Sequence, residues 1–191
     1  MIKTKMWLCE ADKIAPNELG FELSFATYME IMARGGTAWE VAQKAGVDEK
    51  TIALQRAKRD EVYREFLASQ EIEIAGVADV LKTLAKEYKM GIVTTSRRVD
   101  FELIHAKRGI VEFMDFTLCV EEYPRAKPHP DPYLAGMAKF GAKPHECLVI
   151  EDSQRGLSAA FNAGIECAVV HNEFTKTHDF SKASHFLQSL R

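Results

Sequence analysis

The hydrophobic pattern changes period most clearly within residues 147–165. Residues 148–150 (Leu-Val-Ile) form a continuous apolar run, which is typical of a strand buried on both faces of a parallel sheet. From Ser153 the apolar positions follow a helical period that stops at a glycine. Glu151 and Asp152 stand at this change, so the sequence predicts two acids at the carboxyl end of a buried strand. Ligands bind at that edge of an open α/β sheet. The alternative is a solvated turn whose acid only caps the helix.

The second half of the chain repeats this alternation of short apolar runs and helical patterns. After residue 76 the pattern predicts helices at 77–84, 99–108 and 131–140 and strands at 90–93, 116–120 and 166–170. The tail from residue 172 is polar and then weakly helical. In the first half, the apolar run at 6–9 predicts one more strand, and residues 17–73 are helical throughout. We therefore expect an α/β fold with a separate helical insertion.

Composition and charge narrow the functional classes. The 191 residues are 47% hydrophobic and 28% charged, which suits a soluble globular chain with one sizeable core and a small accessory domain. The net charge of −3 gives no general field that would attract nucleic acid or anionic lipid. No apolar stretch approaches membrane-span length or has the form of a signal peptide, so we expect a cytoplasmic protein without a membrane partner. The four cysteines lack CxxC spacing and are expected to be reduced core thiols.

Residues 38–56 resemble a helix-turn-helix, with basic side chains where a recognition helix would lie. The alternative is an ordinary helical hairpin with a solvated basic face. Acidic residues interrupt the basic ones and dilute the patch, so we expect hairpin packing and no nucleic-acid partner.

Polar residues also follow the strand expected at 90–93. Residues 94–98 (Thr-Thr-Ser-Arg-Arg) bring hydroxyls and cations to its carboxyl end, a combination that suits a phosphate group. Arg97 is equally compatible with a solvated loop. Lys127 lies on a segment that three prolines stiffen, immediately before the next predicted helix.

Read together, three segments resemble the motifs of a known family. They are T-T-S at 94–96, A-K-P-H-P-D-P-Y at 126–133 and V-I-E-D-S-Q-R-G-L at 149–157. In order, spacing and residue type they are similar to motifs II, III and IV of the haloacid dehalogenase superfamily, in its β-phosphoglucomutase-like branch of capped phosphatases and phosphomutases. The resemblance is firm over residues 76–170. It implies a Rossmann-like α/β core with a parallel sheet and an inserted helical cap.

The resemblance also implies a chemistry, in which an aspartate is phosphorylated while Mg²⁺ and a lysine neutralise the phosphoryl oxygens. Carried over to this chain, Lys127 would bridge nucleophile and phosphate, and Glu151 and Asp152 would hold Mg²⁺ directly or through water. The implied phosphate-binding residues are Thr94, Thr95, Arg97 and Lys127, and the resemblance implies that Thr94 and Lys127 are also catalytic residues.

The first family motif, D-x-D-G after an apolar strand, is matched imperfectly. Glu10 stands at the nucleophile, Asp12 at the second acid and Lys13 at the glycine. The match implies that Glu10 and Asp12 are catalytic residues and metal ligands. The extra methylene of glutamate displaces the carboxylate by ~1 Å, which can cost ~10²-fold in rate. Alternatively, the first twenty residues lack the motif and the two acids match by chance.

We therefore expect residues 1–16 and 74–191 to form an α/β core domain and residues 17–73 a helical cap. The expected function is Mg²⁺-dependent hydrolysis of a small phosphorylated metabolite. Two alternatives stay open. A sugar phosphomutase would use the same motifs, and a catalytically inactive phospholigand-binding protein is motivated by Glu10 and Lys13. The sequence does not specify the substrate or the oligomeric state.

Overall fold

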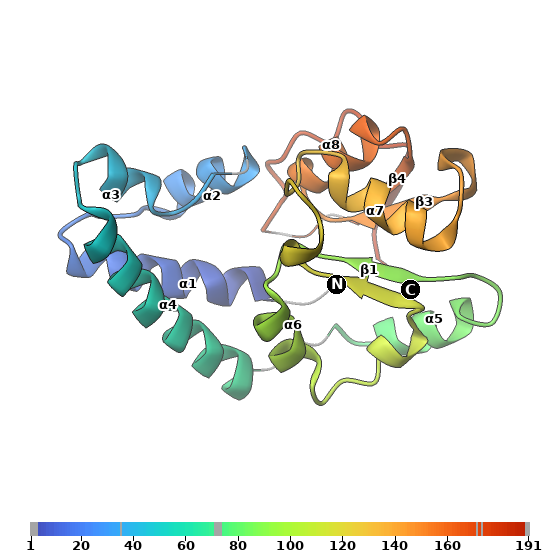
Figure 1. Ribbon diagram of the computed structural model, residues 1–191, viewed down its shortest axis with the longest axis horizontal. Coiled ribbons are helices and arrows are strands. Elements are labelled where there is room, and N and C mark those ends of the chain that lie inside the picture. Colours follow the sequence, from blue (N-terminus) through green and yellow to red (C-terminus); the bar gives the residue numbers. More distant parts are fainter. Residues whose placement is uncertain (1–3, 35, 71–73, 171, 173, 190–191) are drawn as a thin grey trace. The chain divides into compact units, whose positions relative to one another are not determined.

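The computed structural model describes residues 4–34, 36–70, 74–170, 172 and 174–189. The chain divides into two compact units, residues 2–73 and residues 74–191. In Figure 1 the first unit runs from blue to teal and contains helices, whereas the second runs from green to red and also contains strands. None of the described helices is long and apolar enough to cross a membrane.

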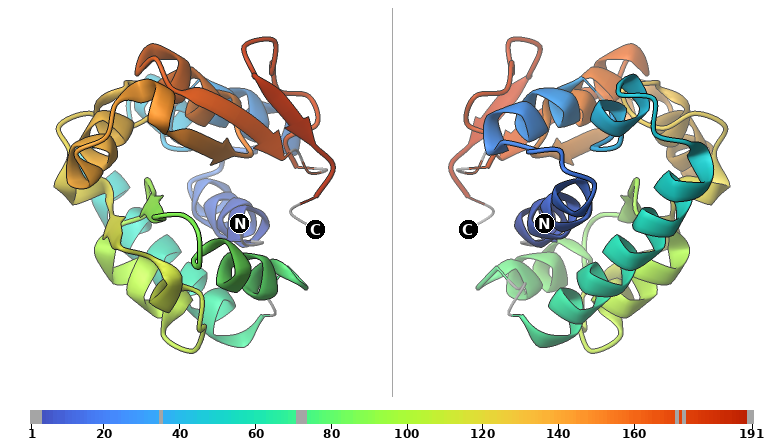
Figure 2. Two further views of the ribbon diagram at one scale, coloured as in Figure 1. Left: turned by 90° about the vertical axis from the view of Figure 1, so that its right-hand side faces the viewer. Right: turned by 90° about the vertical axis from the view of Figure 1, so that its left-hand side faces the viewer.

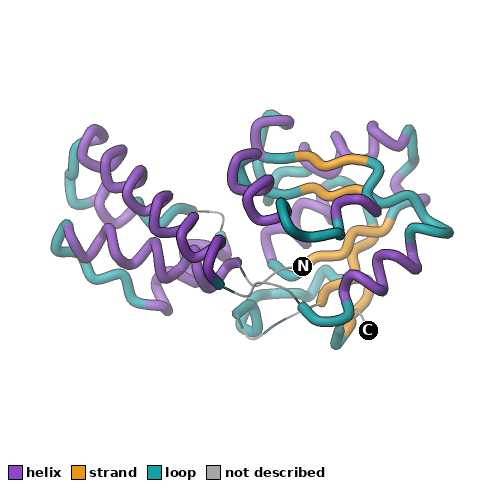
Figure 3. Tube along the Cα trace, turned by 90° about the horizontal axis from the view of Figure 1, so that it is seen from below, coloured by secondary structure: helices purple, strands orange, loops and turns teal. Residues whose placement is uncertain are grey.

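The first unit is helical, as Figure 3 shows. Its helices are α1 (Thr4–Glu18), α2 (Phe25–Ala33), α3 (Glu40–Lys44) and α4 (Glu49–Ser69). Helix α4 begins where the side chain of Asp48 accepts a hydrogen bond from Thr51 N at 3.0 Å, as an N-cap does. Trp39, Ala42 and Ile52 are buried together, so residues 38–56 pack as a helical hairpin around an apolar cluster.

The strand that we expected at residues 6–9 is wrong, because these residues lie within α1. The helix buries Cys9 and Asp12, which are three positions apart on one face, and α1 packs against α4. On the outside, Lys13 Nζ donates to Glu10 Oε1 at 2.8 Å. A run of four apolar residues is too short to show a period, so the pattern could not distinguish a strand from a helix. Residues 4–16 consequently belong to the helical unit.

Asp12 forms a buried ion pair with Arg59 of α4. Burial raises the pKa of the Asp12 carboxyl to about 6, even though the Arg59 guanidinium acts to lower it. The folded unit therefore retains a proton that the unfolded chain releases near pH 4.

Asp12 should make the helical unit less stable as the pH rises. The contribution of Asp12 to the free energy of unfolding is fully present below its pKa in the unfolded chain, near 4. It is lost as the pH rises through its pKa in the folded protein, about 6. The expected loss is on the order of 2–3 kcal/mol. Urea unfolding at several pH values, followed by tryptophan fluorescence, would measure it, because Trp7 and Trp39 both lie in residues 2–73. Asp12→Asn should remove this part of the pH dependence. If the free energy of unfolding changed with pH equally in variant and wild type, the prediction would be contradicted.

The second unit alternates strands and helices. Its elements are α5 (Val77–Leu84), β1 (Gly91–Val93), α6 (Arg98–His105), β2 (Phe116–Leu118), α7 (Asp131–Phe140), β3 (Leu148–Glu151), α8 (Gln154–Asn162), β4 (Glu166–Val170) and β5 (His185–Leu187). Short 3₁₀ turns lie at Val111–Phe113, Val120–Glu122 and Pro144–Glu146. The four strands predicted in this half are confirmed, but β3 is buried on one face only, because Leu148 and Ile150 are 54% and 44% exposed. The tail, expected to be weakly helical, instead supplies β5.

The strands form two parallel sheets. β1 pairs with β2, and β3, β4 and β5 pair in that order, as the left view of Figure 2 shows for the second sheet. Helix α7 packs against β1 and β2, while its Tyr133 joins the apolar cluster that contains Val149 of β3. Gly136 permits the close approach to the first sheet, because a Cβ there would lie 3.1 Å from Val93 Cγ2. One helix thus covers both sheets and brings the carboxyl ends of β1 and β3 near its N-terminus.

Candidate functional site

Glu151, the last residue of β3, is the centre of a buried hydrogen-bond network. Its Oε1 accepts hydrogen bonds from Lys127 Nζ and from the Tyr133 hydroxyl, each at 2.6 Å. Its Oε2 accepts from Asp152 N and from the Ser153 hydroxyl, each at 3.0 Å. Burial, and then the Glu151 charge, raise the pKa of Tyr133 well above its usual value, so this hydroxyl keeps its proton and donates. All four bonds fix the carboxylate in one orientation.

Lys127 connects the two sheets. Its Nζ donates to Val93 O at 3.0 Å, at the end of β1, and forms the ion pair with Glu151 at the end of β3. The lysine head also lies 4.5 Å from the centre of the Tyr133 ring, within cation–π distance. Lys127 and Glu151 are only 9% and 8% exposed, so the pair is desolvated and its charges interact strongly.

The loop after β1 carries the expected hydroxyls in an ordered arrangement. Thr94 Oγ1 accepts a hydrogen bond from Ser96 N at 3.1 Å and also bonds the Ser96 hydroxyl. The Tyr123 hydroxyl donates to Thr94 O at 2.6 Å. Thr94 follows directly on Val93, whose carbonyl receives Lys127, so the threonine and the lysine belong to one edge of the unit.

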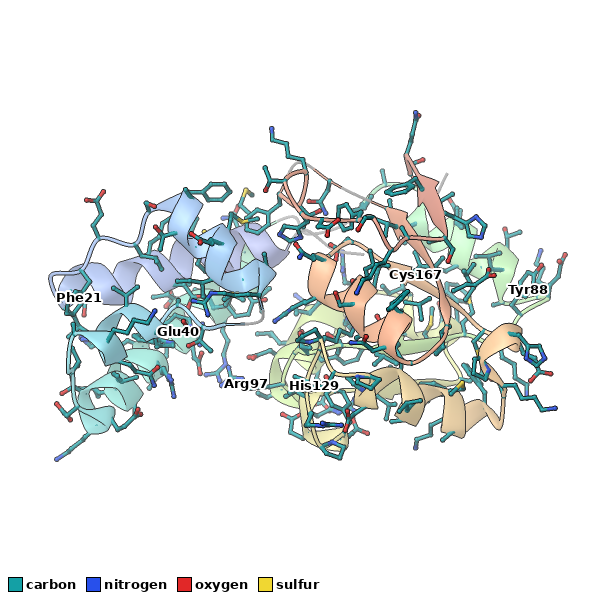
Figure 4. All side chains as sticks on the ribbon, turned by 90° about the horizontal axis from the view of Figure 1, so that it is seen from above. Phe21, Glu40, Tyr88, Arg97, His129 and Cys167 are labelled. Carbon is teal, nitrogen blue, oxygen red and sulfur yellow. The ribbon has the colours of Figure 1, made fainter. Side chains whose placement is uncertain are left out.

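The arginines near this loop have different partners. Arg97, labelled in Figure 4, forms an ion pair with Asp100 at 2.7 Å, and Arg98 pairs with Glu122. Arg155, which sequence reasoning missed, donates from Nη2 to the Thr95 hydroxyl at 3.0 Å. A neutral hydroxyl leaves the positive charge of the Arg155 guanidinium uncompensated by that bond. The sequence signal that could have indicated Arg155 is its place in residues 149–157, the segment that resembles motif IV. In the structure it lies in the first turn of α8.

Ser153 explains how the sequence builds this turn. It is the N-cap of α8, accepting from Gly156 N at 3.2 Å, while its hydroxyl donates to Glu151. The change from strand to helix at Ser153 therefore also orients the carboxylate before it.

A divalent cation at this edge would need carboxylate oxygens as ligands. Glu151 uses both oxygens in hydrogen bonds, so Asp152, which is half-buried, is the better direct ligand. No cluster of three or more histidine, cysteine or acidic side chains suited to a metal occurs among the described residues. Mg²⁺ is commonly bound by one or two carboxylates together with water and phosphate oxygens of the substrate, so the donor set fits that ion.

Glu10 and Asp12, the other expected ligands, lie on α1 in the helical unit. We assigned them because we expected a strand to end at Glu10. Residues 4–18 form a helix instead. Glu10 is exposed and pairs with Lys13, whereas Asp12 is buried against Arg59. Their roles as catalytic residues and metal ligands stay predictions, as does the alternative that they match the first motif by chance.

The cysteines of the described chain are free thiols. Burial raises the pKa of Cys167, labelled in Figure 4, to about 12, and that of Cys119 to about 11. These groups stay protonated at neutral pH and are unreactive.

The fold defines a class of protein, together with the edge at the carboxyl ends of β1 and β3 that carries Thr94, Lys127, Glu151 and Asp152. The family described as haloacid dehalogenase-like hydrolases matches residues 2–170, and the chain belongs to it. Among curated relatives, protein CbbY of Rhodobacter capsulatus is 30% identical over 141 residues, which cover 71% of this chain and 62% of the relative. Pyrophosphatase PpaX of Bacillus cereus is 32% identical over 113 residues, covering 56% and 52%. The chain thus spans only 62% and 52% of the lengths of these two relatives.

Solved structures show the same fold. CbbY of Rhodobacter sphaeroides in complex with xylulose-1,5-bisphosphate has a TM-score of 0.84 and 22% identity, with coverage of 100% of this chain and 90% of that chain. A putative phosphoglycolate phosphatase of Lactobacillus plantarum has a TM-score of 0.82 and 20% identity, with the same coverage.

Proposed function

We propose that this protein is a phosphohydrolase that releases phosphate from a small phosphorylated compound and depends on Mg²⁺. The observation that carries the proposal is the buried Lys127–Glu151 pair beside Thr94, at the carboxyl ends of β1 and β3. Family membership supports it. Among the relatives, PpaX is named a pyrophosphatase and CbbY has been crystallised with a bisphosphate.

Each residue has a role in this proposal. Lys127 places a desolvated positive charge against the phosphoryl oxygens, and the Thr94 hydroxyl donates to one of them. Arg155 supplies a further phosphate contact in preference to Arg97, whose charge Asp100 offsets. Asp152 holds Mg²⁺, with Glu151 acting through its bonds to Lys127 and the turn. When bound, Mg²⁺ neutralises charge on the phosphoryl oxygens.

The helical unit would serve as the cap that excludes water and selects the substrate. This division differs from the sequence expectation in one respect, since residues 4–16 belong to the helical unit.

A second candidate is a phospholigand-binding protein without turnover. The observation that favours it concerns the nucleophile. Glu10 lies on α1 and is paired with Lys13, and Glu151 accepts four hydrogen bonds that lower its reactivity as a nucleophile. Binding needs the cations of this edge but no free carboxylate.

A phosphate-release assay separates the candidates. The full chain would be incubated with p-nitrophenyl phosphate, pyrophosphate, 2-phosphoglycolate and sugar phosphates, with Mg²⁺ or with a chelator, and binding of the same compounds would be measured by calorimetry. Mg²⁺-dependent release supports the hydrolase. Binding without release supports the second candidate, and isomerisation of a phosphosugar primed by a bisphosphate would identify a mutase. The absence of both binding and release would refute both proposals.

A further inference from the structure

The segment after β4 contacts the turn that carries Asp152. Asn172 Nδ2 donates to Asp152 Oδ2 at 3.3 Å. Two further bonds join the same pair of segments, Gln154 N to His178 Nδ1 at 3.3 Å and Asp179 N to Gln154 Oε1 at 3.1 Å. The β3–α8 turn is therefore held by three hydrogen bonds from a segment that lies about twenty residues later in the chain.

The orientation of the Asn172 amide is fixed by its own local turn. Its Oδ1 accepts from Phe174 N at 2.9 Å and lies 3.5 Å from the Thr175 hydroxyl. Thr175 is 1% exposed, and its hydroxyl also accepts from Asn172 N at 3.4 Å. Because the carbonyl side of the amide faces this turn, the NH₂ side must face Asp152. The donor is therefore presented to the carboxylate before any ligand arrives.

We infer that Asn172 is a positioning residue, which holds the Asp152 carboxylate in the orientation that binds a divalent cation. The inference rests on the metal site of the proposed function. Side chains that hydrogen-bond a metal ligand reduce the cost of ordering it, and their loss commonly weakens metal affinity 10–100-fold. Sequence patterns do not indicate this role, because Asn172 stands in a polar tail outside the three motifs.

The competing explanation is that Asn172 only stabilises its own turn. Serine separates the two roles. In Asn172→Ser, the hydroxyl can still accept from Phe174 N, as serine does in such turns, but it is too short to reach Asp152. Asn172→Ala removes both bonds. Asn162→Ala is the matched control, because Asn162 is an exposed asparagine whose amide donates to Pro128 O at 3.2 Å.

The experiment is calorimetric titration of the wild-type chain and the three variants with Mg²⁺ alone, accompanied by thermal unfolding. We expect the Kd for Mg²⁺ to rise about 10–100-fold in both Asn172→Ser and Asn172→Ala. Asn162→Ala should keep the wild-type affinity, and Asn172→Ser should keep the wild-type unfolding temperature. Wild-type affinity in a folded Asn172→Ser would overturn the positioning role. A wild type that binds no Mg²⁺ would instead overturn the metal site itself, on which the inference depends.

Discussion

Lys127→Met should lose phosphate binding and any ester turnover by on the order of 10²–10³-fold, as the removal of one preorganised charge from an active site typically does. It should also destabilise the protein. Lys127 and Glu151 are both more than nine-tenths buried, so the variant leaves an uncompensated anion in the interior, at a cost of about 3–5 kcal/mol. Phosphate titration and urea unfolding would measure the two effects.

The double variant Lys127→Met with Glu151→Gln distinguishes the two effects. Removing both charges leaves no unpaired ion. The glutamine carbonyl can still accept from Ser153, while its NH₂ group can donate to the oxygen of the Tyr133 hydroxyl. We expect most of the lost free energy of unfolding to return, while phosphate binding stays lost. If the double variant regained phosphate affinity as well, Lys127 would be a structural counter-ion and not a phosphate ligand.

The β3–α8 segment shows what the sequence could predict. Its strand is a continuous apolar run, its helix has a clear period, and the change falls on a serine that caps the helix. These signals are local, because each depends on residues within a few positions of one another. The placement of Glu151 and Asp152 at the strand end followed from them, before any resemblance was used.

The errors arose where the decisive partner lies far away in the sequence. The apolar run at 6–9 belongs to a helix whose Asp12 is held by Arg59, 47 residues later. Strand β5 is exposed along its three residues and has no hydrophobic alternation. It exists because its backbone pairs with β4.

The site was predicted in the same uneven way. Thr94 and Lys127 were placed by the resemblance, and the structure brings Lys127 to the carbonyl of the residue before Thr94. Arg155 and Asn172 were missed, because their partners, Thr95 and Asp152, are 60 and 20 residues away. The pairing of Arg97 with Asp100 depends on a side-chain rotamer that the sequence pattern does not specify.

Gly156→Ala should disrupt this site, because the added methyl group would collide with the Glu151 carboxylate. A Cβ on Gly156 would lie 2.0 Å from Glu151 Cδ and 2.1 Å from its Oε1, well inside van der Waals contact. The carboxylate cannot move away without losing its bonds to Lys127, Tyr133 and Ser153. We expect a loss of about 1–3 kcal/mol of unfolding free energy, which is typical of overpacking, despite the helix preference of alanine.

Phosphate and Mg²⁺ binding should fall together in Gly156→Ala, because displacing Glu151 moves both Lys127 and the turn that carries Asp152. Gly109→Ala is the matched control. A Cβ there would meet only the Glu112 side chain, with Oε1 at 2.9 Å and Cδ at 3.8 Å, and this exposed side chain can move aside. The control should stay within about 0.5 kcal/mol of the wild type, as surface substitutions usually do. If both alanine variants retained wild-type stability and ligand affinity, the rigid carboxylate could not be the element that organises this edge.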